Sequence, residues 1–323
     1  MDNWERSIDD RVSLLEDTLR VNSKNLAYNL FKLGMKIGVF SYASNGKKSF
    51  SVPYIPNNEF LEKYLNASKR IGLLRKKNGS YDIGYFRMNF NRRDFENIIP
   101  EYIAMYDDIA AMAHYKAISK DHPNVLMSFG KDADVWDIFF SNPFCFVYRE
   151  IIKDILKLKN GDRVLDVGCG SVAPVYFAEL VGPNGCYRGI EKSKGLAKIA
   201  NKRLRRRGMD WAQVKNIDFE KASVFGRYDY IICAWVINYL DNIRKGLKSL
   251  VSSVSPGGKI VFFDIFPDLV DFDVTVYEFY NSLNKSFKGF ITSHELLGTL
   301  SEFDPELEVS HASKTFLIIE KKA

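Results

Sequence analysis

Three acidic residues stand at the ends of apolar segments in the second half of this 323-residue sequence. Asp166 lies in VLDVGCG just before Gly168 and Gly170, Glu191 ends CYRGIE, and Asp218 ends QVKNID. Glycines after a strand let the backbone turn sharply and approach a ligand, and the next helix offers free N–H groups. Carboxylates at strand ends can bind ribose hydroxyls and cationic or amino groups. The pattern predicts a site for a charged, nucleoside-bearing cofactor.

The glycine loop alone does not decide which cofactor this is. The stretch GCGSVA (168–173) fits the loose G-x-G-x-x-A dinucleotide fingerprint, so a nicotinamide dinucleotide stays open. Asp166 would repel a pyrophosphate, however, whereas it would attract the ammonium and sulfonium groups of S-adenosylmethionine. We expect Asp218 to accept from an adenine amino group and Phe219 to pack on the adenine ring. The three acids together favour S-adenosylmethionine.

The elements that must position these residues alternate between strands and helices from residue 162 onward. An amphipathic helix over 143–159 leads into the first strand. Apolar strands separated by helical segments predict a doubly wound, mostly parallel, Rossmann-like α/β sheet covered on both faces. The expected strands are 163–167, 186–191, 213–218, 228–235, 258–266 and 314–322.

The first half of the chain reads as helical. Asn22-Ser23 is expected to cap a second helix after a first that starts near Trp4, and Asn78-Gly79 is expected to form a hairpin turn. A helix followed by a basic hairpin is the outline of a winged helix. The break at His122-Pro123-Asn124 predicts two domains, 1–123 and 124–323. The expected helices are 4–19, 26–37, 59–72 and 95–120.

Composition narrows the class of protein further. The chain is 46% hydrophobic and 27% charged, and 46 basic against 40 acidic residues give a net charge of only +6. This mild charge is not that of a dedicated nucleic-acid binder. The four cysteines are scattered, which favours a reducing compartment and predicts neither a disulfide framework nor a metal site. The polar start MDNWERSIDD predicts no signal peptide, and YIICAWVI (230–237) is too short to span a bilayer, so we expect a cytoplasmic protein.

The segment from about 145 to 323 resembles a class I S-adenosylmethionine-dependent methyltransferase. VLDVGCG matches the glycine motif, GIE (189–191) the ribose acid, NID (216–218) the adenine acid, YDYIICAWVINYL (228–240) the strand and loop at the active-site mouth, and SPGG (255–258) a later turn. Val172 departs from a third glycine found in many members. The resemblance implies S-adenosylmethionine as cofactor, bound by Asp166, Gly168, Cys169, Gly170, Glu191, Asp218, Phe219, Ala234, Trp235 and Tyr148.

The N-terminal half resembles the winged-helix dimerisation domain of small-molecule O-methyltransferases. The resemblance implies a homodimer and a small, aromatic or apolar methyl acceptor. Plant-type members carry a catalytic histidine in the loop after the fourth strand, where this chain has Asn238. Asparagine cannot take a proton near neutral pH, so the sequence names no general base. The residues expected to contact the acceptor are Asn238, Tyr239, Phe144 and His114.

Two other classes of function stay open. The basic stretch KIANKRLRRRG (198–208) and the hairpin residues Arg75, Lys76 and Lys77 would also suit phosphate contacts. An RNA or protein methyltransferase, or a nucleic-acid-binding regulator that retains the cofactor fold, would use them in this way. Cys233 is expected to be a packed strand residue rather than a nucleophile.

Overall fold

The structure, a computed structural model, describes residues 7–40, 54–78, 80–86, 90, 92–122, 128–221 and 226–323. The chain forms two compact units, and it passes between them more than once. The first, called here the sheet unit, comprises Met1–Glu16, Ser128–Val270 and Ser286–Ala323. The second, the helical unit, comprises Asp17–Met127 and Asp271–Lys285. The boundary expected at residues 123 and 124 lies outside the described residues.

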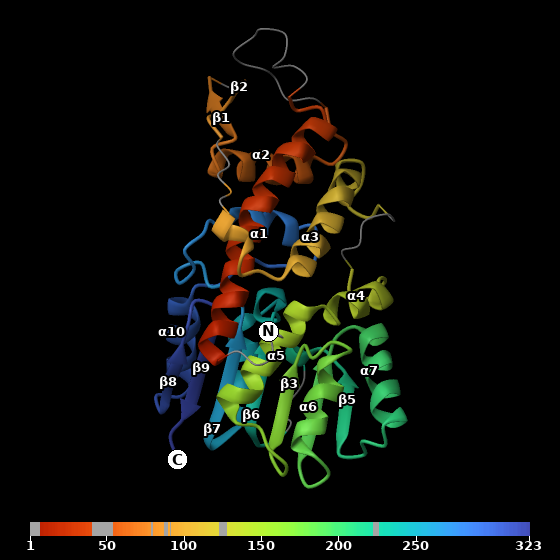
Figure 1. The fold of residues 1–323 in the computed structure, drawn as a ribbon, viewed down its shortest axis with the longest axis vertical. Helices are drawn as coiled ribbons and strands as arrows, with labels where there is room; N and C mark the ends of the chain where they lie inside the picture. Colours follow the sequence, from red (N-terminus) through yellow and green to blue (C-terminus); the bar gives the residue numbers. More distant parts are fainter. Residues whose placement is uncertain are drawn as a thin grey trace. The chain divides into compact units, whose positions relative to one another are not determined.

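The sheet unit is built on seven strands in the order β5-β4-β3-β6-β7-β9-β8 (Figure 1). The five strands from β5 to β7 run parallel, while β9 runs antiparallel to both β7 and β8. The predicted mostly parallel sheet is therefore confirmed. The edge strand β8 was not predicted, because its side chains are nearly all exposed and its apolar alternation extends only over Leu307 and Val309. The strands are β3 Arg163–Val167, β4 Cys186–Glu191, β5 Ala212–Asn216, β6 Tyr228–Ala234, β7 Val254–Phe263, β8 Leu307–Ala312 and β9 Phe316–Lys321.

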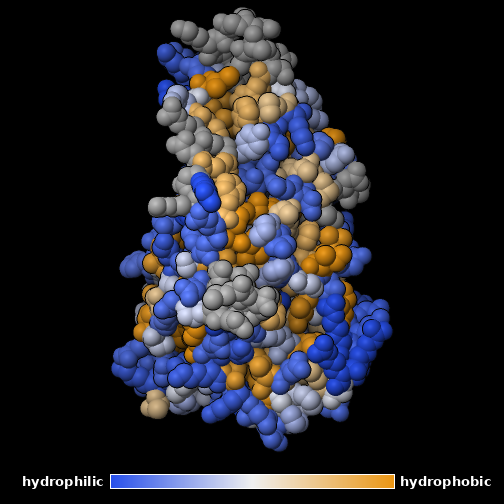
Figure 2. Space-filling model, viewed as in Figure 1, coloured by the Kyte–Doolittle hydropathy of each residue, from blue (hydrophilic) through white to orange (hydrophobic). Residues whose placement is uncertain are grey.

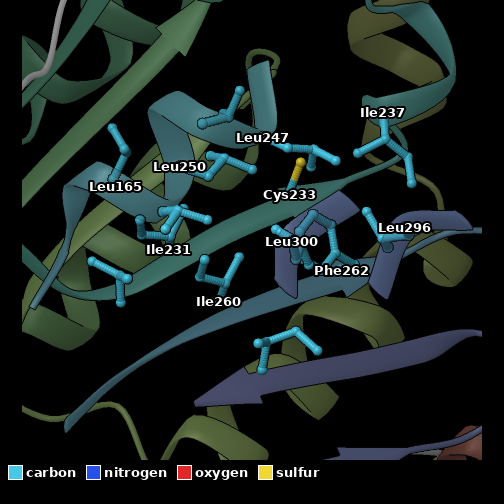
Figure 3. Packing of buried hydrophobic residues seen from close by; sticks show 14 of the residues in the cluster. Leu165, Ile231, Cys233, Ile237, Leu247, Leu250, Ile260, Phe262, Leu296 and Leu300 are labelled. Carbon is cyan, nitrogen blue, oxygen red and sulfur yellow. The ribbon is translucent and has the colours of Figure 1, made fainter. Parts of the chain in front are cut away.

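Helices cover both faces of the sheet. Leucines of α8 and α10 pack on side chains from β3, β6 and β7, and the Cys233 side chain lies among them (Figure 3). Cys233 is thus a packed strand residue, as expected. On the other face lie α5 and α6 (Figure 1). The helices of this unit are α4 Ala133–Phe140, α5 Pro143–Leu156, α6 Ala173–Val181, α7 Lys194–Arg206, α8 Ile243–Ser253 and α10 Ser293–Phe303, with short 3-10 turns η4 Phe219–Lys221 and η5 Ile237–Tyr239.

The helical unit contains the expected helix and hairpin. Asn57 caps α2, since its side chain accepts from the Phe60 N–H, and the chain then turns at Gly72 into two paired strands. Gly79, in the expected hairpin turn, lies outside the described residues. The elements of this unit are most of α1 Ile8–Lys36, then α2 Asn58–Arg70, β1 Leu74–Lys77, β2 Ser80–Ile83, η2 Arg92–Phe95, α3 Pro100–Met112, η3 Ala113–Ala117 and α9 Thr275–Asn281.

The expected helix break at Asn22-Ser23 is wrong, because α1 runs through both residues. Both side chains are buried and bonded to a distant part of the chain. Asn22 Nδ2 donates to the Tyr277 hydroxyl over 3.0 Å, and that hydroxyl donates to the Leu19 carbonyl over 2.9 Å. Ser23 Oγ donates to the Asp273 carbonyl over 3.0 Å. Long-range partners thus satisfy residues that would otherwise favour a cap.

The basic stretch 198–208 falls mainly on α7. Leu196, Ala200 and Leu204 are buried on one side of this helix, while its basic residues give the hydrophilic surface over α7 in Figure 2. This amphipathic pattern is what an outer helix on a sheet needs. In the described part of the chain, no helix is both long enough and apolar enough to span a bilayer.

Candidate functional site

The glycine loop joins β3 to α6 in a conformation that requires glycine. Gly168 and Gly170 have φ angles of 67° and 62°, in the left-handed region. The Gly168 N–H donates to the Ile190 carbonyl over 2.8 Å, which fixes the loop to the end of β4. A Cβ on Gly168 would lie 2.6 Å from Val236 Cγ2, and one on Gly170 would lie 3.3 Å from the Phe140 ring. The loop therefore needs the space that glycine leaves.

Glu191 is the predicted ribose acid, and the structure places it against this loop. Its Oε2 accepts from the Gly170 N–H over 2.9 Å and its Oε1 from the Ser193 N–H over 2.7 Å. Burial raises the pKa of Glu191, while these backbone donors oppose the rise. Each carboxylate oxygen keeps a second lone pair for another donor. A pair of neighbouring ribose hydroxyls fits this arrangement.

Asp166 is buried in β3, where the Tyr187 hydroxyl donates to its Oδ2 over 2.7 Å. Burial raises the pKa of Asp166 to about 7, and Glu191 adds to the rise, while Tyr187 and the positive charge of Arg149 oppose it. The Arg149 guanidinium is also buried; it donates to the Phe140 carbonyl, and its Nε has no hydrogen-bond partner among the described atoms. An acid and a guanidinium within electrostatic reach of each other suit the ammonium and carboxylate of an amino acid.

Asp218 and Phe219 occupy different environments although they are neighbours in sequence. Asp218 follows β5, is partly exposed, and pairs with Lys192, whose Nζ lies 3.1 Å from its Oδ2. Phe219 is only 4% exposed and its ring packs in the hydrophobic core of the sheet unit. The adenine contact expected of this ring stays a prediction. Lys192 directly follows Glu191 at the end of β4, and Asp218 follows the neighbouring strand β5. The ion pair of Lys192 with Asp218 therefore joins the ends of these two strands.

Cys169 lies between the two glycines and is buried. Its N–H donates to the Ile190 carbonyl over 3.2 Å, and its Sγ lies 3.6 Å from the Gly170 carbonyl oxygen. Burial, reinforced by the charges of Asp166 and Glu191, raises the pKa of this thiol well above its ordinary value. Cys169 therefore contributes backbone geometry to the loop, and its thiol stays protonated.

Three predicted residues meet around Phe263, which the sequence analysis did not single out. The Phe263 ring centroid lies 5.0 Å from that of Trp235, 4.9 Å from that of Tyr148 and 6.3 Å from that of Phe144. Ala234 pairs with Phe263 in the ladder between β6 and β7. Trp235 comes next with a φ of 56°, a left-handed conformation that is unusual for a tryptophan. Such strain is concentrated at functional sites.

Asn238 and Tyr239 lie in η5, just after β6. Asn238 is buried, and its Nδ2 donates to Asp264 Oδ1 over 2.5 Å. The Tyr239 ring packs edge-on against Phe129 and Phe287. Asp264 was not predicted as a site residue, although it is an acid at the end of an apolar strand, like Asp166.

His114, expected to contact the acceptor, belongs to the helical unit. Its Nδ1 lies 2.9 Å from the Ala111 carbonyl oxygen and its ring lies 4.2 Å from the Tyr115 ring. Its contact with an acceptor stays a prediction.

Helix α4, which was not predicted, is attached to the glycine loop by polar contacts. Arg203 of α7 donates through both terminal nitrogens to the Asp137 carboxylate, over 2.5 and 2.7 Å. The Ser171 hydroxyl donates to the same carboxylate over 2.6 Å. Ser193 Oγ donates to the Phe129 carbonyl over 2.8 Å. These bonds hold 129–140 against the ends of β3 and β4.

Comparison with known proteins places this geometry in a family. Residues 158–303 match the sequence profile of a methyltransferase domain family. An uncharacterized protein of Methanocaldococcus jannaschii is 33% identical over 320 residues, which cover 96% of this chain and 87% of the relative. A demethylmenaquinone methyltransferase of Geobacillus is 27% identical over 161 residues, covering 48% of this chain and 68% of the relative. The chain belongs to the class I S-adenosylmethionine-dependent methyltransferases.

The fold of the methyltransferase is shared with solved structures. The CMeT domain of the citrinin polyketide synthase superimposes with a TM-score of 0.68 at 12% identity, covering 95% of this chain and 89% of that domain. The cofactor of this chain, S-adenosylmethionine, supplies a methyl group that is activated because it is bound to a positively charged sulfonium. The glycine loop and Glu191 fit the nucleoside end of this cofactor, and Asp166 with Arg149 fits its amino-acid end.

Proposed function

We propose that this methyltransferase acts on a small aromatic or apolar acceptor. The observation that carries the proposal is Trp235, whose left-handed backbone directs the indole into the aromatic group around Phe263 at the carboxyl end of β6. Ligands of open α/β sheets bind beyond the carboxyl ends of the strands. An apolar acceptor would pack on Trp235, which is partly exposed, while the buried rings of Phe263 and of Phe144 and Tyr148 from α5 support the indole from below.

The relatives support the same acceptor class. The Geobacillus relative is named for demethylmenaquinone, a quinone with an aromatic ring. In-line methyl transfer needs the acceptor held opposite the methyl group in a site shielded from water. Aromatic walls provide such shielding, because they are rigid and exclude water.

The test is to incubate the protein with methyl-labelled S-adenosylmethionine and with separated small-molecule, RNA and protein fractions of a cell extract. We expect label in organic-soluble small molecules. Label that enters only RNA or only protein would refute the proposal and support the alternative acceptor classes. Trp235→Ala should reduce transfer at least tenfold, and Trp235→Phe should retain more activity than Trp235→Ala.

We also propose that the helical unit acts as a winged-helix-like module that pairs two copies of the chain. The order α2, β1, β2 supports this, and so do the exposed side chains of Ile83 and Tyr85, which are 54% and 72% exposed. Exposed apolar patches often mark association surfaces. Light scattering should give a dimer for the native chain and a monomer for the double variant Ile83→Asp, Tyr85→Asp. A native chain that scatters as a monomer would disprove the pairing.

A further inference from the structure

Asp264 follows Phe263 at the carboxyl end of β7 and is fully buried. Its Oδ1 accepts from Asn238 Nδ2 over 2.5 Å and from the Ile265 N–H over 2.9 Å. Its Oδ2 is buried as well and has no hydrogen-bond partner in the described part of the structure. An unpartnered buried polar atom is costly, and native proteins rarely keep one without a reason. The two hydrogen bonds leave Oδ2 as the carboxyl oxygen without a donor.

The position of Asp264 in the sheet borders the cofactor site. Ala234 lies opposite Phe263 in the parallel ladder of β6 and β7, so Trp235 and Asp264 leave the sheet at the same level. Strands lie about 4.8 Å apart, so Asp264 is roughly 10 Å across the sheet from β3 and Asp166. Glu191 lies beyond β3 in the opposite direction, on β4. Asp264 therefore lies on the side of the site away from the expected ribose position.

Charge coupling supports the same placement. Burial raises the pKa of the Cys233 thiol, and the charges of Asp264 and Asp166 both add to that rise. Cys233 lies on β6, the strand between the two acids. Both carboxyls therefore lie within electrostatic reach of the strand at whose end Trp235 and Asn238 stand.

We propose that Asp264 Oδ2 accepts the proton of a hydroxyl on the methyl acceptor, with Asn238 orienting the carboxyl through Oδ1. This role rests on the proposed function. The hydroxyl proton passes to Oδ2, the oxygen's electron pair forms the new bond to the methyl carbon, and the methyl–sulfur bond breaks with its electron pair staying on sulfur. The proton later leaves Asp264 to solvent. Asn238 cannot take the proton itself, and here it positions the neighbouring acid.

The groups around Asp264 make its charge responsive to a nearby cation. Burial raises the pKa of Asp264 to about 8, while Asn238 and the Ile265 N–H oppose the rise. The other neighbours are the neutral Cys233 thiol on β6 and the Thr315 carbonyl beside β9, which accepts from the Asp264 N–H. The nearby Lys288 ammonium is paired with Asp241. A positive charge at the site would therefore ionise Asp264 near neutral pH.

Infrared difference titration tests this without any acceptor. The protonated-carboxyl band of the native protein that disappears in Asp264→Asn belongs to Asp264. The band that disappears in Asp166→Asn belongs to Asp166, the second buried acid. We expect the Asp264 midpoint to fall by about one pH unit or more with S-adenosylmethionine, whose sulfonium is positive, and much less with neutral S-adenosylhomocysteine. Asn238→Ala should raise the midpoint. An Asp264 band that is insensitive to both ligands would overturn the proposal.

Kinetics with the acceptor found by methyl labelling gives the second readout. Asp264→Asn should lower kcat more than tenfold, remove the rise of kcat with pH, and leave calorimetric affinity for S-adenosylmethionine within about threefold. Unchanged kcat in Asp264→Asn would overturn the proposal even if the infrared band moves. Label appearing only in RNA or protein would instead refute the acceptor class, while the infrared result on Asp264 would stand.

Discussion

The Gly170 N–H donates to Glu191 Oε2 over 2.9 Å and so connects the loop after β3 to the end of β4. The bond aligns two parts of the site that are 21 residues apart in sequence. The Ser193 N–H bonds the other carboxylate oxygen, so Glu191 is held from both sides. The same carboxylate therefore shapes the loop and keeps a lone pair on each oxygen for a further donor.

Glu191→Ala should weaken S-adenosylmethionine binding more than tenfold, about 1.4 kcal/mol, as measured by calorimetry. It should also destabilise the fold by about 1–3 kcal/mol, because two buried N–H groups lose their acceptor. Glu191→Gln keeps one acceptor oxygen and should therefore lose less cofactor affinity and less stability than Glu191→Ala. Equal affinity in the native and Ala proteins would remove Glu191 from the site.

Cofactor affinity should depend on pH through Asp166. Only the ionised carboxylate attracts the cofactor's cationic groups, and burial raises the pKa of Asp166 to about 7. Affinity should therefore fall by up to about tenfold for each pH unit below 7. Calorimetry at several pH values measures this, and Asp166→Asn should bind weakly with a flat profile. A native profile as flat as that of the variant would contradict the assignment.

Asp166 should also make the unliganded protein less stable as pH rises. Its pKa is raised from an ordinary 3.8 to about 7 in the folded state, so between these values the folded chain binds the proton that the unfolded chain has released. The free energy of unfolding then falls with rising pH across this window. Urea denaturation at pH 4.5, 5.5 and 6.5, chosen as about even steps inside the window, should show a shallower slope for Asp166→Asn. A steeper slope in the variant would count against the raised pKa.

Gly168→Ala should destabilise the fold by about 2–4 kcal/mol, through backbone strain and the collision with Val236. Gly208 is the matched control: its φ of 64° is similar, but a Cβ there meets nothing within 4 Å. Gly208→Ala should therefore cost only about 1–2 kcal/mol, the strain alone. Adding Val236→Ala to Gly168→Ala should recover part of the difference. Thermal unfolding measures all three, and equal losses in the two Ala variants would exclude the collision.

Arg203→Ala should loosen α4, because the side chain holds Asp137 with two hydrogen bonds. Since Arg203 is 37% exposed, we expect the variant to lose only about 1 kcal/mol of cofactor-binding free energy, which is about fivefold in affinity. Limited proteolysis should cut the 128–142 segment faster. Arg205, exposed on the same helix, is the control, and its Ala variant should match the native protein. Equal proteolysis of the two variants would argue against a role for this pair.

Much of the sheet unit could be predicted from local patterns. Strands β3 and β4 begin and end where the apolar runs do, and the acids at residues 166 and 191 stand at their carboxyl ends as expected. Another local feature is the capping box that Thr292 and Glu295 form at the start of α10. These features depend on near neighbours in the chain, because strand and helix periodicity and capping are set within a few residues.

Other features could be decided only by tertiary structure. Asparagine is a residue type that favours helix caps, yet Asn22 lies within α1, because Tyr277, 255 residues away, accepts from its side chain. Asp264 carries the same local signal as Asp166, but only the fold brings it to Asn238 and leaves Oδ2 buried without a partner. The sequence by itself determined the strands of the sheet other than the edge strand β8, the glycine loop and the cofactor class. Tertiary structure decided which polar groups are satisfied, because burial and long-range hydrogen bonds depend on segments that local patterns do not relate.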